Sequence, residues 1–299
     1  MYRIAKAIYK GSGDKSISIQ LKEVFMVASS KRKRRVKKRK DMRKEDGTIK
    51  AKRKFDTIAE NLDVMQDIGK RKRFSPEDLA NIKPLNETQK RFIELYFQDI
   101  PIIMATGWPG TSKSFLSIYC ALNEVFDNSS PYDKLIIVRS AVETRSVGYL
   151  KGSLEDKAEP FELPYKAIFS EIMPRFNDAY YHAKNLGYVD FMLTTHIRGI
   201  NIKNSVILIE EAQNMDIDEL RSVITRTGEE SRILITGDVL QDDLKRKKEK
   251  SGLEQLKRIL LRMPREYYAC VEYSKNDIVR SGIVKEFVIA DFEENNRVY

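Results

Sequence analysis

The stretch Gly107-Trp108-Pro109-Gly110-Thr111-Ser112-Lys113-Ser114 decides the fold of this chain, because of what stands on either side of it. The apolar run Pro101 to Ala105 precedes it, and the apolar-periodic stretch Phe115 to Val125 follows it. This order predicts a strand, a loop and a helix. Such a loop presents backbone N–H groups, a helix N-terminus and a lysine to a polyphosphate, while the serine hydroxyl reaches the phosphate-bound magnesium. All eight residues are therefore candidates for binding a nucleoside triphosphate.

The loop departs from the usual pattern at one position, where glycine normally precedes the lysine and this chain has Ser112. A β-carbon then stands beside the phosphate path. As a bare string, such a loop is as compatible with an ordinary strand-to-helix turn as with a phosphate site. Features further along the chain have to decide between the two.

Short apolar runs alternate with helical patterns after residue 75, which predicts an α/β fold with three layers and a mostly parallel sheet. The expected strands are Ile102 to Ala105, Leu135 to Val138, Val189 to Leu193, Val206 to Ile209, Ile233 to Thr236 and Tyr268 to Tyr273. The expected helices are Glu87 to Phe97, Lys113 to Phe126, Leu163 to Ala183, Ile217 to Thr227, Gly252 to Leu261 and Asp277 to Phe287. In such sheets ligands bind at the carboxyl ends of the strands.

Two adjacent carboxylates, Glu210 and Glu211, follow the apolar run Val206 to Ile209. Successive strand residues point to opposite sides, so one acid can serve the metal and the other the attacking water. We assign magnesium to Glu210, together with Ser114, and water activation to Glu211. Glu210 is one methylene longer than the commoner aspartate, so its metal contact could run through water. The alternative is an acidic strand end that faces solvent.

Two glutamines are candidates for contacts at opposite ends of the nucleotide. Gln241 follows the strand Ile233 to Thr236 and the turn Gly237-Asp238, where it can sense the γ-phosphate. Gln89 precedes the first strand, and its amide suits the edge of adenine because it both donates and accepts hydrogen bonds. Taken alone, Gln89 is equally a helix-surface residue.

Four arginines are candidates for phosphate or nucleic-acid contacts, although most surface arginines are only solvated charge. They are Arg139, Arg198, Arg226 and Arg280. A guanidinium stabilises the charge that develops during phosphoryl transfer. Arg280 is our first choice for that catalytic role, supplied by a neighbouring subunit, and the other three are assigned to nucleic acid.

Basic charge is concentrated in the first quarter of the chain. The whole chain carries a net charge of +10, whereas residues 1–73 hold 24 Lys and Arg against 9 Asp and Glu. The run Lys31 to Lys40, which contains Lys33, Arg34 and Arg35, has little apolar area to bury, and we expect residues 1–74 to be a largely disordered extension. It is a candidate for nucleic-acid contacts or for an address signal. Ser75-Pro76-Glu77 then predicts the start of the folded domain, residues 75–299.

The remaining composition excludes several classes. A hydrophobic content of 41% in 299 residues is enough for a sizeable core. Cys120 and Cys270 are expected to be buried and reduced, and His182 and His196 are too isolated for a zinc site. No apolar run approaches the length that a bilayer demands. We therefore expect a cytoplasmic protein without membrane contact.

The motifs together resemble the PhoH family of predicted ATPases. The resemblance runs from about Lys83 to Ala290. It rests on Gln89, Gly107 to Ser114, Val138 to Glu143, Gly148 to Gly152, His196 to Gly199, Glu210 to Asn214, Thr225 to Gly228 and Thr236 to Asp238. It implies a RecA-like P-loop core related to superfamily 1 helicases, ATP and Mg2+ as ligands, and homo-oligomers, with a hexameric ring as the form to test.

Three functions stay open on the sequence alone. The leading one is a Mg2+-dependent ATPase that acts with RNA or single-stranded DNA in a helicase-like or translocase-like role, with Lys113 holding the phosphates. The second is a non-catalytic nucleic-acid-binding protein with a degenerate nucleotide site. Ser112 and Glu210, which depart from the usual residues, support this alternative. The third, a small-molecule kinase, fits the paired acids and Gln241 less well than attack by water.

Overall fold

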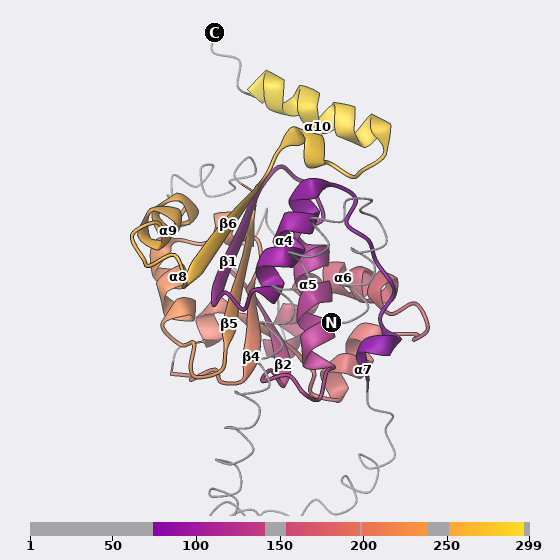
Figure 1. Ribbon diagram of the computed structural model, residues 1–299, viewed down its shortest axis with the longest axis vertical. Coiled ribbons are helices and arrows are strands. Elements are labelled where there is room, and N and C mark those ends of the chain that lie inside the picture. Colours follow the sequence, from indigo (N-terminus) through magenta and orange to yellow (C-terminus); the bar gives the residue numbers. More distant parts are fainter. Residues whose placement is uncertain (1–73, 141–153, 198, 239–250, 296–299) are drawn as a thin grey trace, which may run out of the picture.

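The computed structural model describes residues 74–140, 154–197, 199–238 and 251–295. Six parallel strands form one sheet in the order β3-β2-β4-β5-β1-β6 (Figure 1). They are β1 (Ile102–Gly107), β2 (Lys134–Arg139), β3 (Val189–Leu193), β4 (Ser205–Ile209), β5 (Arg232–Gly237) and β6 (Tyr268–Tyr273). Each contains the residues that the apolar runs predicted, and the predicted α/β fold class is confirmed.

The helices are α4 (Glu87–Phe97), α5 (Lys113–Val125), α6 (Leu154–Ile172), α7 (Ala179–Asn185), α8 (Ile217–Ile224), α9 (Leu253–Leu260) and α10 (Gly282–Asn295). Short 3-10 turns occur at η1 (Pro76–Asp78), η2 (Thr194–His196), η3 (Ala212–Asn214) and η5 (Lys275–Asp277). The starts of α4 and α8 are capped, because the side chains of Asn86 and Asp216 accept hydrogen bonds from backbone N–H groups in the first turn.

Alternation along each strand builds two cores, one on each face of the sheet. On β1, Ile103 and Ala105 belong to the core under α4 to α7, and Ile102 and Met104 belong to the core under α8 and α9. Figure 1 shows these two helix groups on opposite sides of the sheet. The predicted three layers are therefore present.

The core under α4 to α7 begins at Phe74, one residue before the predicted start of the folded domain at residue 75. The Phe74 ring lies 5.1 Å from that of Phe126 and 5.0 Å from that of Phe176, centroid to centroid. Cys120 is buried as expected, whereas Cys270 is only half-buried because β6 is an edge strand. Both cysteines are free. Within the described ranges, no helix combines the length and apolar content needed to cross a bilayer.

The predicted helix over 163–183 is wrong at its start and in its interior. Two helices stand there, since α6 begins at Leu154 and α7 begins only at Ala179. Proline is disfavoured inside helices, so a helix that runs through Pro160 and Pro164 is not expected from sequence. The break between the helices contains Pro174, which has no N–H to donate.

The predicted helix over 277–287 is also wrong, because residues 278–281 separate η5 from α10. The backbone N–H of Val279 donates to the carbonyl of Gly110 at 3.0 Å, so this segment pairs with the loop after β1. That contact competes with a continuous helix. Helix α10 then lies beyond the carboxyl ends of β1 and β6 (Figure 1, yellow).

Candidate nucleotide-binding site

The loop between β1 and α5 needs unusual backbone angles at three positions. Gly107, Gly110 and Ser112 have φ values of 128°, 70° and 68°. A β-carbon on Gly107 would stand 2.0 Å from the Tyr273 carbonyl oxygen, and one on Gly110 would stand 2.8 Å from Cγ of Arg280. Ser112 occupies the left-handed region where the usual pattern has glycine, at a cost of about 1 kcal/mol. The serine therefore keeps the loop's shape but strains it.

Lys113 begins α5 and turns its side chain back under the loop. Its Nζ donates to the carbonyls of Gly107 at 3.2 Å and Trp108 at 2.6 Å, and to the Thr111 hydroxyl at 3.3 Å. Burial lowers the pKa of Lys113, while the nearby charges of Asp238, Glu210 and Glu211 raise it. The loop thus holds a largely buried ammonium group with neutral oxygens.

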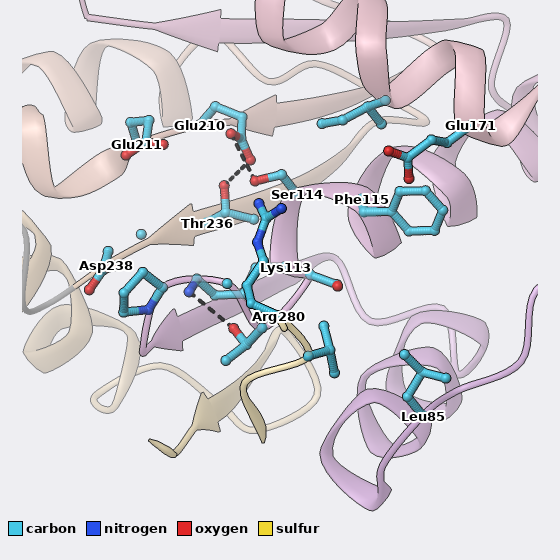
Figure 2. A pocket seen from close by; sticks show the side chains of 17 residues that line it. Leu85, Lys113, Ser114, Phe115, Glu171, Glu210, Glu211, Thr236, Asp238 and Arg280 are labelled. Carbon is cyan, nitrogen blue, oxygen red and sulfur yellow. Dashed lines mark hydrogen bonds between the residues drawn. The ribbon is translucent and has the colours of Figure 1, made fainter. Parts of the chain in front are cut away.

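Glu210 follows β4 and is linked to two other elements by its two carboxylate oxygens. The Ser114 hydroxyl on α5 donates to Oε2 at 3.0 Å, and the Thr236 hydroxyl at the end of β5 donates to Oε1 (Figure 2). Burial, followed by the charge of Glu211, raises the pKa of Glu210 to about 7. Strand β5 lies between β1 and β4, so Thr236 fills the gap between the loop and the acids.

These residues line an open cleft of about 540 Å³ at the carboxyl edge of the sheet. It is lined by Leu85, Pro109, Gly110, Thr111, Ser112, Lys113, Ser114, Phe115, Ile168, Glu171, Glu210, Glu211, Thr236, Gly237, Asp238, Val279 and Arg280. Figure 2 shows Lys113, Ser114 and Glu210 at the centre, with Glu211 and Asp238 on one side and Phe115 and Glu171 on the other. The sequence motifs therefore converge on one cavity.

Arg280 lies in the cleft of its own chain. Its Cγ approaches Gly110, and its side chain extends into the cavity (Figure 2). The role expected from sequence, an arginine delivered to a neighbouring subunit, stays a prediction. The Val279 N–H bond to the Gly110 carbonyl fixes the segment that carries Arg280.

Three of the predicted nucleotide contacts, Gln89, Gly107 and Trp108, stand outside the lining of the cleft. Gln89 is 2% exposed, its Oε1 accepts from the backbone N–H of Leu85 at 2.8 Å, and its Nε2 donates to the Thr111 carbonyl at 3.4 Å. Gln89 thus stabilises the loop between β1 and α5 through its contact with the Thr111 carbonyl. The Trp108 ring packs against Phe292 of α10, with centroids 4.7 Å apart.

The two nucleic-acid candidates that the structure describes, Arg139 and Arg226, lie at opposite edges of the sheet. Arg139 ends β2 at the edge that carries the cleft, and its guanidinium lies 5.8 Å from the Phe161 ring centroid. Arg226 is exposed between α8 and β5, at the amino ends of the strands, and so lies at the opposite edge. Arg198, Gln241, Lys33, Arg34 and Arg35 lie outside the described residues.

Sequence reasoning assigned no role to Thr236, Asp238 or Gln213, which complete the surroundings of the two acids. Thr236 and Asp238 line the cleft, and the Gln213 side chain contacts Glu211. Their signals in the sequence were their positions after or at the end of an apolar strand and their place in the motifs Glu210 to Asn214 and Thr236 to Asp238. No group of three or more His, Cys, Asp or Glu in the described ranges is arranged to hold a metal ion by itself.

The chain has a three-layer fold around a parallel sheet, with a lysine-bearing loop after β1 and paired acids after β4. This combination defines a P-loop nucleotide-binding protein. Comparison with known proteins gives the family. Residues 81–291 match the family model described as PhoH-like protein, and the chain belongs to this family of P-loop ATPases.

Curated relatives support the same assignment. Protein PhoH2 of Bacillus subtilis is 34% identical over 186 residues, which are 58% of this chain and 40% of the relative. A PhoH-like protein of Synechocystis is 31% identical over 204 residues, 68% of this chain and 60% of the relative. Protein PhoH of Escherichia coli is 24% identical over 210 residues, which are 69% of this chain and 57% of the relative. The chain thus spans 40% to 60% of the length of these relatives.

Proposed function

We propose that this protein binds ATP with Mg2+ and hydrolyses it. The observation that carries the proposal is the meeting of Lys113, Ser114 and Glu210 in one cleft, with Glu211 beside them. These groups come from two separate motifs almost a hundred residues apart. A structural role alone gives no reason for a lysine and two carboxylates to share an open cavity.

The Ser114 and Glu210 oxygens fit a magnesium ion that is shared with phosphate. They lie 3.0 Å apart, and both are hard oxygen donors. When bound, the ion would neutralise charge on the phosphate oxygens. The raised pKa of Glu210 fits a carboxylate whose charged form requires a positive partner.

The other residues divide the remaining work. The Lys113 ammonium group would leave the loop carbonyls for the phosphates, and Arg280, which lies against Gly110 of the same loop, would add positive charge. Glu211 would orient and deprotonate the attacking water. Gln241 keeps its proposed role as sensor of the γ-phosphate and lies outside the described residues.

Turnover measurements test the proposal. Release of inorganic phosphate from ATP and Mg2+ is compared between the protein and its Lys113→Ala and Glu211→Gln variants. Each variant should lose turnover by about 100-fold or more, because each removes a group that acts on the transition state. Glu211→Gln should retain nucleotide binding. Equal turnover in all three proteins contradicts the proposal.

We further propose that RNA or single-stranded DNA is the partner of the ATPase, in a helicase-like role. The excess of basic residues in 1–73 supports this, because it favours polyanions. Deletion of residues 1–73 should flatten the salt dependence of nucleic-acid binding. A homo-oligomer, with a hexameric ring as the form to test by mass measurement, and a cytoplasmic location belong to the same proposal.

A non-catalytic nucleic-acid-binding protein is the second candidate. Two observations favour it, namely the strained Ser112 and the hydrogen bonds that hold the Lys113 ammonium group on its own loop. It predicts that nucleic acid binds while phosphate release stays at background in the unmodified protein. The turnover measurement therefore separates the two candidates.

A further inference from the structure

One buried amide connects the ends of two strands beside the cleft. Gln213 lies in η3, directly after the acids, and is 2% exposed. Its Nε2 donates to Oε2 of Glu211 at 2.6 Å, and its Oε1 accepts from the backbone N–H of Asp238 at 2.9 Å. The side chain thus joins the acid after β4 to the turn after β5.

Only one orientation of this amide satisfies both partners. A carboxylate can only accept, and a backbone N–H can only donate, so a flipped amide would face each of them with the wrong group. The space is also limited, because a β-carbon on Gly237 would stand 3.3 Å from Oε1 of Gln213. The contacts therefore fix both the position and the direction of the side chain.

The two acids are held by different means, and this difference suggests the role of Gln213. Glu210 accepts from the hydroxyls of Ser114 and Thr236, which belong to α5 and β5. The Glu211 carboxylate accepts a hydrogen bond from the Gln213 amide, and the backbone of Glu211 has a φ of 53°. Because the Glu211 backbone is in the left-handed region, its carboxylate needs a hydrogen-bond partner to keep one orientation in the cleft.

We propose that Gln213 is a positioning residue for hydrolysis, which aims the Glu211 carboxylate at the attacking water. This rests on the proposed function, in which Glu211 activates that water. An amide suits the task because it donates to the carboxylate without adding a charge. Its second contact, to the Asp238 N–H, ties the direction of Glu211 to the turn that precedes residue 239.

Two variants separate the contacts. Gln213→Glu keeps the shape and the acceptor for the Asp238 N–H but, when ionised, replaces the donor to Glu211 with a like charge. Gln213→Met removes both at similar volume. Gln98→Glu is the matched control, since Gln98 is exposed at the end of α4, near the opposite edge of the sheet. Phosphate release, the affinity for a non-hydrolysable ATP analogue with Mg2+, and the melting temperature are measured for each.

Gln213→Glu should lower kcat by about 10- to 100-fold, while affinity for the analogue stays within about threefold. The control should match the unmodified protein. A merely structural role would instead change affinity and melting temperature together with kcat. An unchanged kcat in Gln213→Glu overturns the inference.

A double-mutant comparison shows whether Gln213 acts through Glu211. In the Glu211→Gln background, Gln213→Glu should cause no further loss of kcat, because the group that it positions is already disabled. The same fold-loss in both backgrounds overturns the inference. Absence of turnover in the unmodified protein overturns the proposed function itself, and is thus distinct from a failure of Gln213 alone.

Discussion

Buried charges occur at both edges of the sheet, but they are balanced in opposite ways. At the amino edge, Arg232 donates to Asp99 at 2.8 Å and to Glu124 at 3.3 Å, and its guanidinium lies 4.4 Å from the Tyr96 ring centroid. At the carboxyl edge, the Lys113 ammonium group is held by neutral oxygens, and two carboxylates stand side by side. At the first edge the buried cation has ion-pair partners within the chain, whereas the second edge has charges that a ligand would balance.

The largest expected effect concerns the balanced edge. Arg232→Met should lower the free energy of unfolding by about 3–5 kcal/mol, because it removes the cation that pairs with the buried Glu124 carboxylate. Lys113→Met should change it by about 1 kcal/mol or less, since this lysine has no buried ion pair to lose. Denaturant unfolding of both variants provides the measurement. Equal destabilisation by the two would remove the contrast between the edges.

The next effect concerns pH at the carboxyl edge. The pKa of Glu210 is raised from 4.5 to about 7, so between these values the folded state holds a proton that the unfolded state has lost. Stability should therefore fall as pH rises through this window, by about 3 kcal/mol from this group. Unfolding of the protein and of Glu210→Gln is compared without metal or nucleotide, and the two curves should diverge. If the free energy of unfolding had the same pH dependence in both proteins, Glu210 would not be the source of this effect.

The smallest effect concerns the loop itself. Ser112→Gly should stabilise the protein by up to about 1 kcal/mol, because glycine adopts a φ of 68° without strain. Gly110→Ala should destabilise it by more, since its β-carbon would meet Arg280. Thermal unfolding of both variants measures the difference. A loss of stability in Ser112→Gly would mean that the serine side chain holds the loop.

The strands were predictable because each is a mostly apolar run, interrupted only by Asp190 in β3 and Glu272 in β6, that is followed by a polar residue. The same pattern brought Lys113 and Glu210 to one edge, since parallel strands end together. The arrangement around the acids was not predictable in this way. Thr236 reaches Glu210 because β5 lies between β1 and β4, and strand order follows from packing rather than from local sequence.

The role of Gln89 shows a second limit of the sequence. Its amide chemistry was clear, but a glutamine that can bind adenine can equally bind backbone, and here its partners are Leu85 and Thr111. The segment before α10 shows a third limit. Its local pattern predicts a helix, yet the Val279 contact with Gly110 places it across the loop and brings Arg280 into the cleft.

A calorimetric titration with a non-hydrolysable ATP analogue and Mg2+ tests the central claim most directly. The charges at the carboxyl edge should bind one analogue per chain, and Lys113→Ala should weaken that binding at least about tenfold. The Arg232→Met variant, if it is folded at the temperature used, should bind as the unmodified protein does. Equal affinity in the unmodified protein and Lys113→Ala would contradict the account.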